Sequence, residues 1–258
     1  MKEYIGILDS GVGGLSVLAE LYKIMPDKNY IFFGDTKNMP YGTKTVEQIY
    51  SCTKRIIDFF IENNVKNVVF ACNTTSATVY DILQKEYINK VKIFPLIQPV
   101  AKYVVSDLKD KDNVVVFATR ATVNAGKYSK EIYKTNPNIK VYEIDCTGFV
   151  EIVEKRLYKD RNALNLIELK LDEAKKYRPK RIVLGCTHYP YLVDIFKSIL
   201  PDVEYFNPAS CLAEIVKNEI GGISGNSDIR FCVSKNPEEF KLAGKMFFDI
   251  KGDVELVG

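Results

Sequence analysis

Residues 66–75 read KNVVFACNTT and residues 180–189 read KRIVLGCTHY, so one short pattern occurs twice in the chain. In each copy an apolar run ends in a cysteine that small hydrogen-bonding residues follow. Such runs are typical of buried parallel strands, and ligands bind at the carboxyl edge of open α/β sheets. Cys72 and Cys186 are therefore predicted to reach one ligand from two related halves of the chain.

Strand-like runs alternate with helical segments, which indicates a doubly wound α/β architecture. Residues 45–62 show the 3.6-residue period of a helix, with Thr45 and Gln48 as a capping box. Helices are also expected at 15–25, 162–177 and 190–199, because each stops at or just before a proline. The strands are expected at 4–8, 30–34, 66–71, 92–96, 113–118, 139–144, 180–185, 203–206 and 229–233.

The duplicated pattern predicts two pseudo-symmetric doubly wound domains, each with a mostly parallel sheet, and an active site in the cleft between them. A chain of 258 residues is long enough for two such domains. We place the first domain at 1–97 plus 208–258 and the second at 98–207, because breaks fall near Gln98 and near Pro208.

Composition argues against several classes of protein. Lys and Arg number 36 against 33 Asp and Glu, without a long basic block, so nucleic acid is not expected as the main partner. No apolar run reaches the ~20 residues of a membrane span, and the first residues lack the apolar segment of a signal peptide. We expect a cytoplasmic protein, in which thiols stay reduced and the six cysteines act individually.

The cysteines fall into two groups. A free cysteine is most often a small buried side chain, and this role fits Cys52, Cys146, Cys211 and Cys232. Cys72 and Cys186 differ, because the Asn-Thr-Thr and Thr-His that follow them are typical of a helix start. The unpaired N–H groups and the positive dipole end there should lower the pKa of a thiol and receive a carboxylate.

Two polar residues accompany these thiols. His188, the only histidine, comes two residues after Cys186 in a turn closed by Pro190, which favours a site residue over a structural one. Asp9 ends an apolar run; it could reach the site or cap a helix near Leu15. The glycines at 11–14 form neither GxGxxG nor a Walker loop, so they predict a close approach to something small and anionic. Without HExxH or paired CxxC, no metal site is expected.

Four segments together resemble the cofactor-independent aspartate/glutamate racemase family: LDSGVGG at 8–14, GDT at 34–36 with PYG at 40–42, ACNTTS at 71–76 and GCTHYP at 185–190. The similarity is collinear over nearly the whole chain. His188 points to the glutamate branch, since aspartate racemases usually carry an acidic residue there. The resemblance implies interconversion of L- and D-glutamate without a cofactor, with D-glutamate supplied for peptidoglycan and cell wall biogenesis. Glutamate is then the small-molecule partner, and a homodimer is expected.

The same resemblance implies a set of site residues. Cys72 and Cys186 would be the acid/base thiols, assisted by Asp9, His188 and Glu154, with Glu151 as an extra acid. Departures from the family's usual residues occur at Ala118, Arg120, Ala125 and Thr147-Gly148. The implied substrate contacts are Asp9, Ser10, Pro40, Tyr41, Gly42, Asn73, Thr74, Thr119, Thr122, Thr187 and His188.

Racemisation explains why two thiols are needed. Removal of the α-proton leaves a near-planar carbanion, and a proton must return on the opposite face, which one base cannot do cleanly. Neutral hydroxyl and amide donors in a water-poor cleft would stabilise the charge. Two alternatives stay open: a cysteine hydrolase or transferase that uses Cys72 or Cys186 with His188 and Asp9, and a small-ligand-binding module that kept the cleft. The hydrolase leaves one cysteine motif unexplained.

Overall fold

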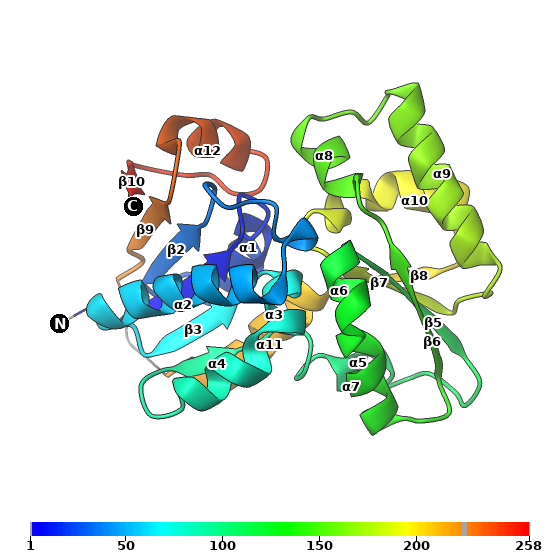
Figure 1. Cartoon of the computed structure of the whole chain (residues 1–258), viewed down its shortest axis with the longest axis horizontal. Helices are drawn as coiled ribbons and strands as arrows, with labels where there is room; N and C mark the ends of the chain where they lie inside the picture. The colour runs from blue at the N-terminus through cyan, green and yellow to red at the C-terminus, as the bar shows by residue number, and fades with distance from the viewer. Residues whose placement is uncertain (1, 223–225, 258) are drawn as a thin grey trace.

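The computed structural model describes residues 2–222 and 226–257, and these form two sheets flanked by helices (Figure 1). The larger sheet has the strand order β10-β9-β2-β1-β3-β4, and the smaller has the order β6-β5-β7-β8. Every strand pair in both sheets is parallel. The prediction of an α/β fold with two parallel sheets is confirmed.

The larger sheet combines two separated parts of the chain. Its strands are β1 (Ile5–Asp9), β2 (Tyr30–Gly34), β3 (Asn67–Phe70), β4 (Lys92–Phe94), β9 (Ile229–Val233) and β10 (Val254–Leu256). Its helices are α1 (Leu15–Ile24), α2 (Val46–Glu62), α3 (Asn73–Thr78), α4 (Tyr80–Glu86), α11 (Pro208–Ile220) and α12 (Pro237–Gly244), with the 3-10 turn η1 (Tyr41–Thr43). The sequence did not predict β10, because its three residues are largely exposed and form no apolar run.

The smaller sheet comes from the middle of the chain. Its strands are β5 (Asn113–Ala118), β6 (Lys140–Asp145), β7 (Arg181–Gly185) and β8 (Glu204–Phe206). The accompanying helices are α5 (Ala101–Val104), α6 (Arg120–Ala125), α7 (Lys127–Thr135), α8 (Phe149–Glu154), α9 (Arg161–Lys175) and α10 (Val193–Ile199), with the 3-10 turn η2 (Tyr189–Leu192). The prediction of an α-helix over 190–199 is therefore wrong for its first turn. That turn is a 3-10 helix, a geometry often found at helix starts.

Side-chain alternation explains why both faces of the larger sheet are covered. Ile7 and Phe32 belong to a core that includes α1, whereas Leu8 and Phe33 belong to a second core that includes α2. α2 begins as predicted, since Thr45 and Gln48 form reciprocal capping bonds. The first core continues without a break into the smaller sheet, so the two halves share apolar packing.

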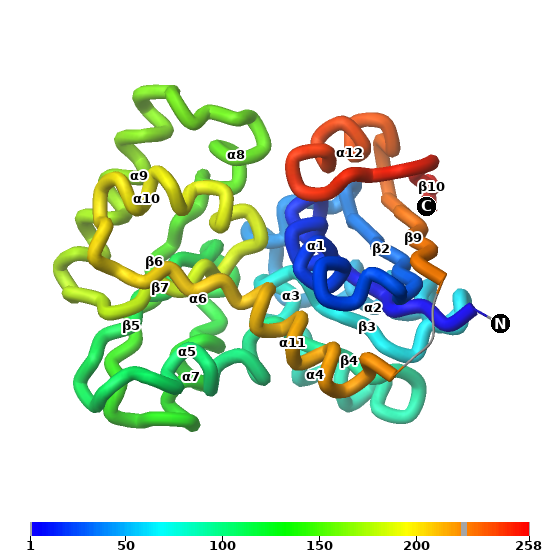
Figure 2. The backbone as a smooth tube through the Cα atoms, turned by 180° about the vertical axis from the view of Figure 1, so that it is seen from behind, coloured from blue at the N-terminus to red at the C-terminus, as the bar shows by residue number. Residues whose placement is uncertain are grey.

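The chain returns to the larger sheet after β8. α11 packs against α1, which is visible from behind in Figure 2, and β9 then pairs with β2. The division of the chain at 97 and 208 stays a prediction, and residues 1, 223–225 and 258 of the first proposed domain lie outside the described residues.

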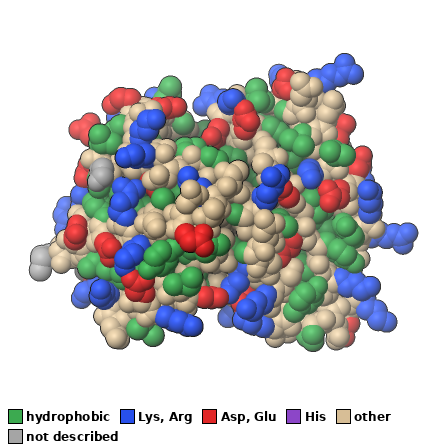
Figure 3. Space-filling model, viewed as in Figure 1, with side chains coloured by type: hydrophobic (Ala, Val, Ile, Leu, Met, Phe, Trp, Pro, Cys, Tyr) green, Lys and Arg blue, Asp and Glu red, His purple; other side chains and the backbone are tan. Residues whose placement is uncertain are grey.

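The surface shows no concentration of one charge on the face drawn in Figure 3, where Lys and Arg are interspersed with Asp and Glu. This agrees with the formal net charge of +3. Within residues 2–222 and 226–257, no helix has both the length and the apolar character that crossing a membrane requires.

Candidate active site

One cavity of about 410 Å³ collects most of the predicted site residues at the carboxyl edges of both sheets. Asp9 and Thr122 are the two predicted site residues that do not line it; both are buried behind it. The predicted residues that line it are Ser10, Pro40, Tyr41, Gly42, Cys72, Asn73, Thr74, Thr119, Glu154, Cys186, Thr187 and His188.

Cys72 enters the cavity from the larger sheet, between β3 and α3. Its thiol is nearly buried and donates a hydrogen bond to Ser10 Oγ over 3.9 Å. Burial, and then the nearby charge of Asp9, raises the pKa of the Cys72 thiol to about 11. The prediction that a helix start lowers the pKa of this thiol is therefore wrong, because lost hydration outweighs what the six-residue α3 supplies.

Asp9 is placed behind Cys72 at the end of β1. Its Oδ2 accepts the Gly11 N–H at 3.0 Å, whereas Oδ1 has no hydrogen-bond partner among the described residues. Burial raises the pKa of Asp9 to about 6. α1 begins at Leu15 after its N-cap residue Gly14, and the bond that Asp9 accepts comes from Gly11, ahead of the helix. The charge of Asp9 is the second cause, after burial, that raises the pKa of the Cys72 thiol.

Cys186 enters from the smaller sheet and begins a chain of polar contacts. Its Sγ lies 3.8 Å from His188 Nδ1, and His188 Nε2 lies 3.0 Å from Glu154 Oε1. Burial lowers the pKa of His188, but the hydrogen bonds with Cys186 and Glu154 outweigh it and raise the pKa to about 10. His188 is therefore protonated at neutral pH, and it can give a proton to Cys186 or stabilise charge that develops on the sulfur.

The two candidate acids on α8 are distinguished by their contacts. Glu154, at the end of α8, reaches His188 and lines the cavity. Glu151 also lines the cavity, but its carboxylate accepts from Lys155 at 2.6 Å and is largely exposed. Glu154 is thus the acid that bears on the imidazole.

Three threonine hydroxyls form a triangle across the two halves. Thr119 Oγ1 lies 3.0 Å from both Thr74 Oγ1 and Thr122 Oγ1, and Thr122 donates to Thr74 over 3.3 Å. Thr74 belongs to α3, and the other two belong to the start of α6. Since each hydroxyl can both donate and accept, the triangle can redirect donors to a bound carboxylate.

Glycines allow chain segments to approach this closely, both between the halves and within one of them. A Cβ on Gly13 would lie 2.3 Å from His188 Cε1, and one on Gly14 would lie 2.3 Å from Asp9 Cβ. Gly42 packs likewise, because its Cβ would come within 2.8 Å of Thr119 Cβ. The prediction that the 11–14 cluster approaches a small anionic ligand is therefore corrected for Gly13 and Gly14, which make room for other parts of the protein. Of the three glycines at 11–14, only Gly11 lines the cavity.

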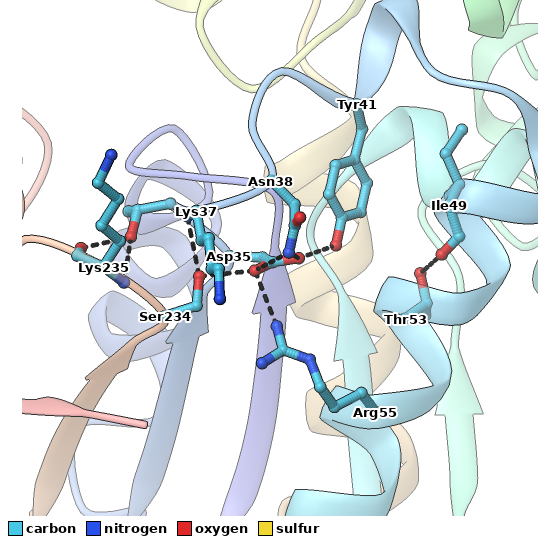
Figure 4. Close-up of polar contacts among 10 residues, drawn as sticks. Asp35, Lys37, Asn38, Tyr41, Ile49, Thr53, Arg55, Ser234 and Lys235 are labelled. Atoms are coloured by element: carbon cyan, nitrogen blue, oxygen red, sulfur yellow. Dashed lines mark hydrogen bonds and ion pairs between the residues drawn. The ribbon is translucent and has the colours of Figure 1, made fainter. Parts of the chain in front are cut away.

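Tyr41 forms a wall of the cavity that Asp35 holds from behind (Figure 4). Asp35 Oδ2 accepts from the Tyr41 hydroxyl at 2.6 Å, and Oδ1 accepts from Ser234 at 2.6 Å and from Arg55 at 3.0 Å. Asn38 donates to both oxygens. The sequence predicted only a turn at Asp35, because three of these donors are 6 to 199 positions away in the chain.

Further residues line the cavity without having been predicted as substrate contacts: Gly11, Met39, Thr43, Thr147, Gly148, Val150, Glu151 and Lys155. Lys155 is the one cationic side chain of Lys or Arg type among the lining residues. Its place just after α8 carries no motif that could have identified it. In the described part of the chain, no group of three or more His, Cys, Asp or Glu side chains could hold a metal ion.

The chain is similar to known proteins both in sequence and in structure. A glutamate racemase of Caldanaerobacter subterraneus subsp. tengcongensis is 39% identical, over 96% of this chain and 94% of its own. The structure of a glutamate racemase from Francisella tularensis in complex with D-glutamate superposes with a TM-score of 0.90 at 31% identity, covering 100% of this chain and 98% of that one. An isoform from Bacillus anthracis superposes with a TM-score of 0.91 at 26% identity, covering 99% and 97%. No family model matches the chain.

Proposed function

The chain belongs to the glutamate racemase family, and we propose that it interconverts L- and D-glutamate by passing the α-proton between Cys72 and Cys186. The single observation that supports this mechanism best is the presence of two thiols, supplied by different sheets, in one cavity. Each thiol also has its own polar assistant, Asp9 for Cys72 and His188 for Cys186.

The proton balance requires the thiols in opposite states. One thiolate takes the α-proton, so that an S–H bond forms and the C–H electron pair stays on the substrate as a carbanion. The other thiol then gives its proton to the opposite face of that carbon and becomes the thiolate. In the reverse direction the two thiols exchange roles.

The neighbouring groups assist each transfer in a different way. The Asp9 charge disfavours a resting thiolate at Cys72, which keeps this residue ready as a proton donor. The His188 imidazolium, held by Glu154, can return a proton to Cys186. Hydroxyl and amide donors, among them Ser10, Asn73 and Thr74, hold the carboxylates and the developing charge. No cofactor has a role in these steps.

The rival with a single catalytic cysteine receives less support. Cys186, His188 and Glu154 could serve as a nucleophile, a base and an orienting acid. In this version Glu154 takes the place that the sequence offered to Asp9, and such a hydrolase or transferase leaves the second thiol, Cys72, without a role. Labelling with iodoacetate, followed by assays of amide and ester hydrolysis, separates the two functions.

The decisive experiment uses the purified chain alone. L-Glutamate should lose its circular dichroism signal without added cofactor, and the product should carry deuterium at the α-carbon when the solvent is D₂O. Absence of racemisation, or complete dependence on pyridoxal phosphate or on a metal, would refute the mechanism.

We also propose that D-glutamate made by this chain serves peptidoglycan synthesis in the cytoplasm, and that the chain forms a homodimer. These proposals are supported by the family resemblance. Light scattering coupled to size-exclusion chromatography tests the dimer, and growth of a depleted strain on D-glutamate tests the cellular role.

A further inference from the structure

Tyr128 is a completely buried phenol in α7 that lies beside both cysteine segments without lining the cavity. Its hydroxyl donates to Asn73 Oδ1 over 2.6 Å, and Asn73 directly follows Cys72. Its ring packs on Gly185, which directly precedes Cys186, since a Cβ there would lie 3.2 Å from Tyr128 Cε2. One side chain therefore contacts the residues next to both thiols.

The contact with Asn73 determines which end of the amide is fixed. An asparagine side chain has an accepting oxygen and a donating nitrogen of nearly equal size, so packing alone does not orient it. Burial, followed by the charges of Glu143 and Cys186, raises the pKa of Tyr128 well above its usual range, so the phenol keeps its proton, and its hydroxyl donates to Asn73 Oδ1 over 2.6 Å. The oxygen of Asn73 is thereby committed to Tyr128.

Because Oδ1 is bonded to Tyr128, the side-chain nitrogen of Asn73 is the group available to a ligand in the cavity. Asn73 lines the cavity, and its Nδ2 has no hydrogen-bond partner among the described residues. An N–H donor favours a carboxylate, whereas a carbonyl oxygen in the same place would repel one.

We propose that Tyr128 is a positioning residue that fixes the Asn73 amide with its N–H group toward the cavity, and so sets the preference of the site for a carboxylate. This rests on the proposed function, because the carboxylate is one of those of glutamate. Tyr128 belongs to the half that carries Cys186, so the donor on one side of the cleft is oriented from the other.

The test compares Tyr128→Phe with a matched control, Tyr30→Phe. Both phenols are completely buried, but the Tyr30 hydroxyl donates to the Met25 carbonyl, and Tyr30 does not line the cavity. Initial rates are measured from L- and from D-glutamate, together with competitive inhibition by glutamine and isoglutamine, in which one carboxylate is an amide.

Tyr128→Phe should raise KM for both enantiomers by about threefold to tenfold, the effect of one lost hydrogen bond, with kcat within about threefold of the wild type. The inhibition constant of at least one amide analogue should rise less than KM, because a neutral group gains less from a fixed donor. Four results would overturn the proposal. They are a smaller rise in KM, a loss that falls mainly on kcat, inhibition constants of both analogues that rise as much as the KM of glutamate, and the same changes in Tyr30→Phe.

A measurement on the wild type covers the case in which Tyr128→Phe fails to fold. The side-chain NH₂ signals of Asn73, assigned by their loss in Asn73→Ala, should shift in a ¹⁵N spectrum when D-glutamate is added. Unshifted signals refute the role of Tyr128. A wild-type protein that does not racemise glutamate refutes the proposed function instead, so the two failures are distinguishable.

Discussion

Asp9→Asn should make the protein more stable at pH 8 while it slows turnover. Burial raises the pKa of Asp9 from 3.8 to about 6 in the folded protein. The unfolded chain therefore releases this proton at lower pH than the folded chain, and the folded state becomes less stable as pH rises from about 4 to 6. Two pKa units correspond to about 3 kcal/mol, a cost that is fully present at pH 8 and about half present at pH 5.

The amide substitution removes this cost but introduces a smaller one. The carbonyl of the new side chain could still accept the Gly11 N–H, whereas its NH₂ would replace Oδ1, which has no partner among the described residues. An unsatisfied buried donor costs about 1 kcal/mol. The free energy of unfolding should thus rise by about 2 kcal/mol at pH 8. At pH 5 the gain is smaller by about 1.5 kcal/mol, which leaves about 0.5 kcal/mol.

Urea unfolding of the wild type and of Asp9→Asn at both pH values measures the difference. Asp35→Asn is the matched control, because Asp35 is equally buried at the end of the adjacent strand but accepts hydrogen bonds from four side chains. Asp35→Asn should lower the free energy of unfolding by about 3 kcal/mol. The reasoning fails if Asp9→Asn is less stable than the wild type at pH 8, or if its advantage is the same at both pH values. Turnover should fall by ~10²-fold to 10⁴-fold.

Four further results are expected. Cys72→Ser and Cys186→Ser should each abolish racemisation in a circular dichroism assay, while each retains elimination from a glutamate analogue of only one configuration; near wild-type racemisation in both would contradict the two-thiol assignment. His188→Asn should lower kcat at saturating substrate unequally in the two directions, with kcat/KM still equal because the free enantiomers have equal energies; unchanged turnover both ways would return His188 to a structural role. The pKa of His188 is raised from 6.5 to about 10, so its contribution to stability is fully present below pH 6.5 and is lost as pH rises through about 10. Between pH 7 and 10, the free energy of unfolding measured in urea should therefore fall more for the wild type than for His188→Asn. Equal falls in the two proteins would refute this. Gly13→Ala should reduce racemisation strongly, since its Cβ would lie 2.3 Å from His188 Cε1, whereas Gly222→Ala, with no atom within 4 Å of its Cβ, should not.

Local patterns in the sequence predicted the strand ends that carry the chemistry. An apolar run followed by a cysteine and small polar residues specifies both a buried strand and its exit, so Cys72 and Cys186 could be placed without knowledge of the tertiary contacts. The capping box of Thr45 and Gln48 is equally local. Family resemblance added Glu154, which no spacing rule connects with His188.

The remaining features depend on contacts that sequence patterns do not encode. The pKa of Cys72 follows from how completely the fold buries it, and the helix start alone predicted the wrong direction. Tyr128 meets Asn73 across 55 positions, and Ser234 meets Asp35 across 199. No periodicity relates such pairs, so their roles could be inferred only from the folded arrangement.

The order of strands in the larger sheet has a consequence for biosynthesis. During translation β2 emerges early, yet its neighbour β9 is made about two hundred residues later. Until then one edge of β2 is an unpaired template for other chains, a hazard in nascent proteins. Ser234 directly follows β9, so the hydrogen bonds of Asp35 behind Tyr41 are completed only after β9 has been made. A polypeptide released before residue 229 would contain both thiols and every residue that lines the cavity, but Asp35 would lack the Ser234 hydrogen bond that helps to hold Tyr41 in place.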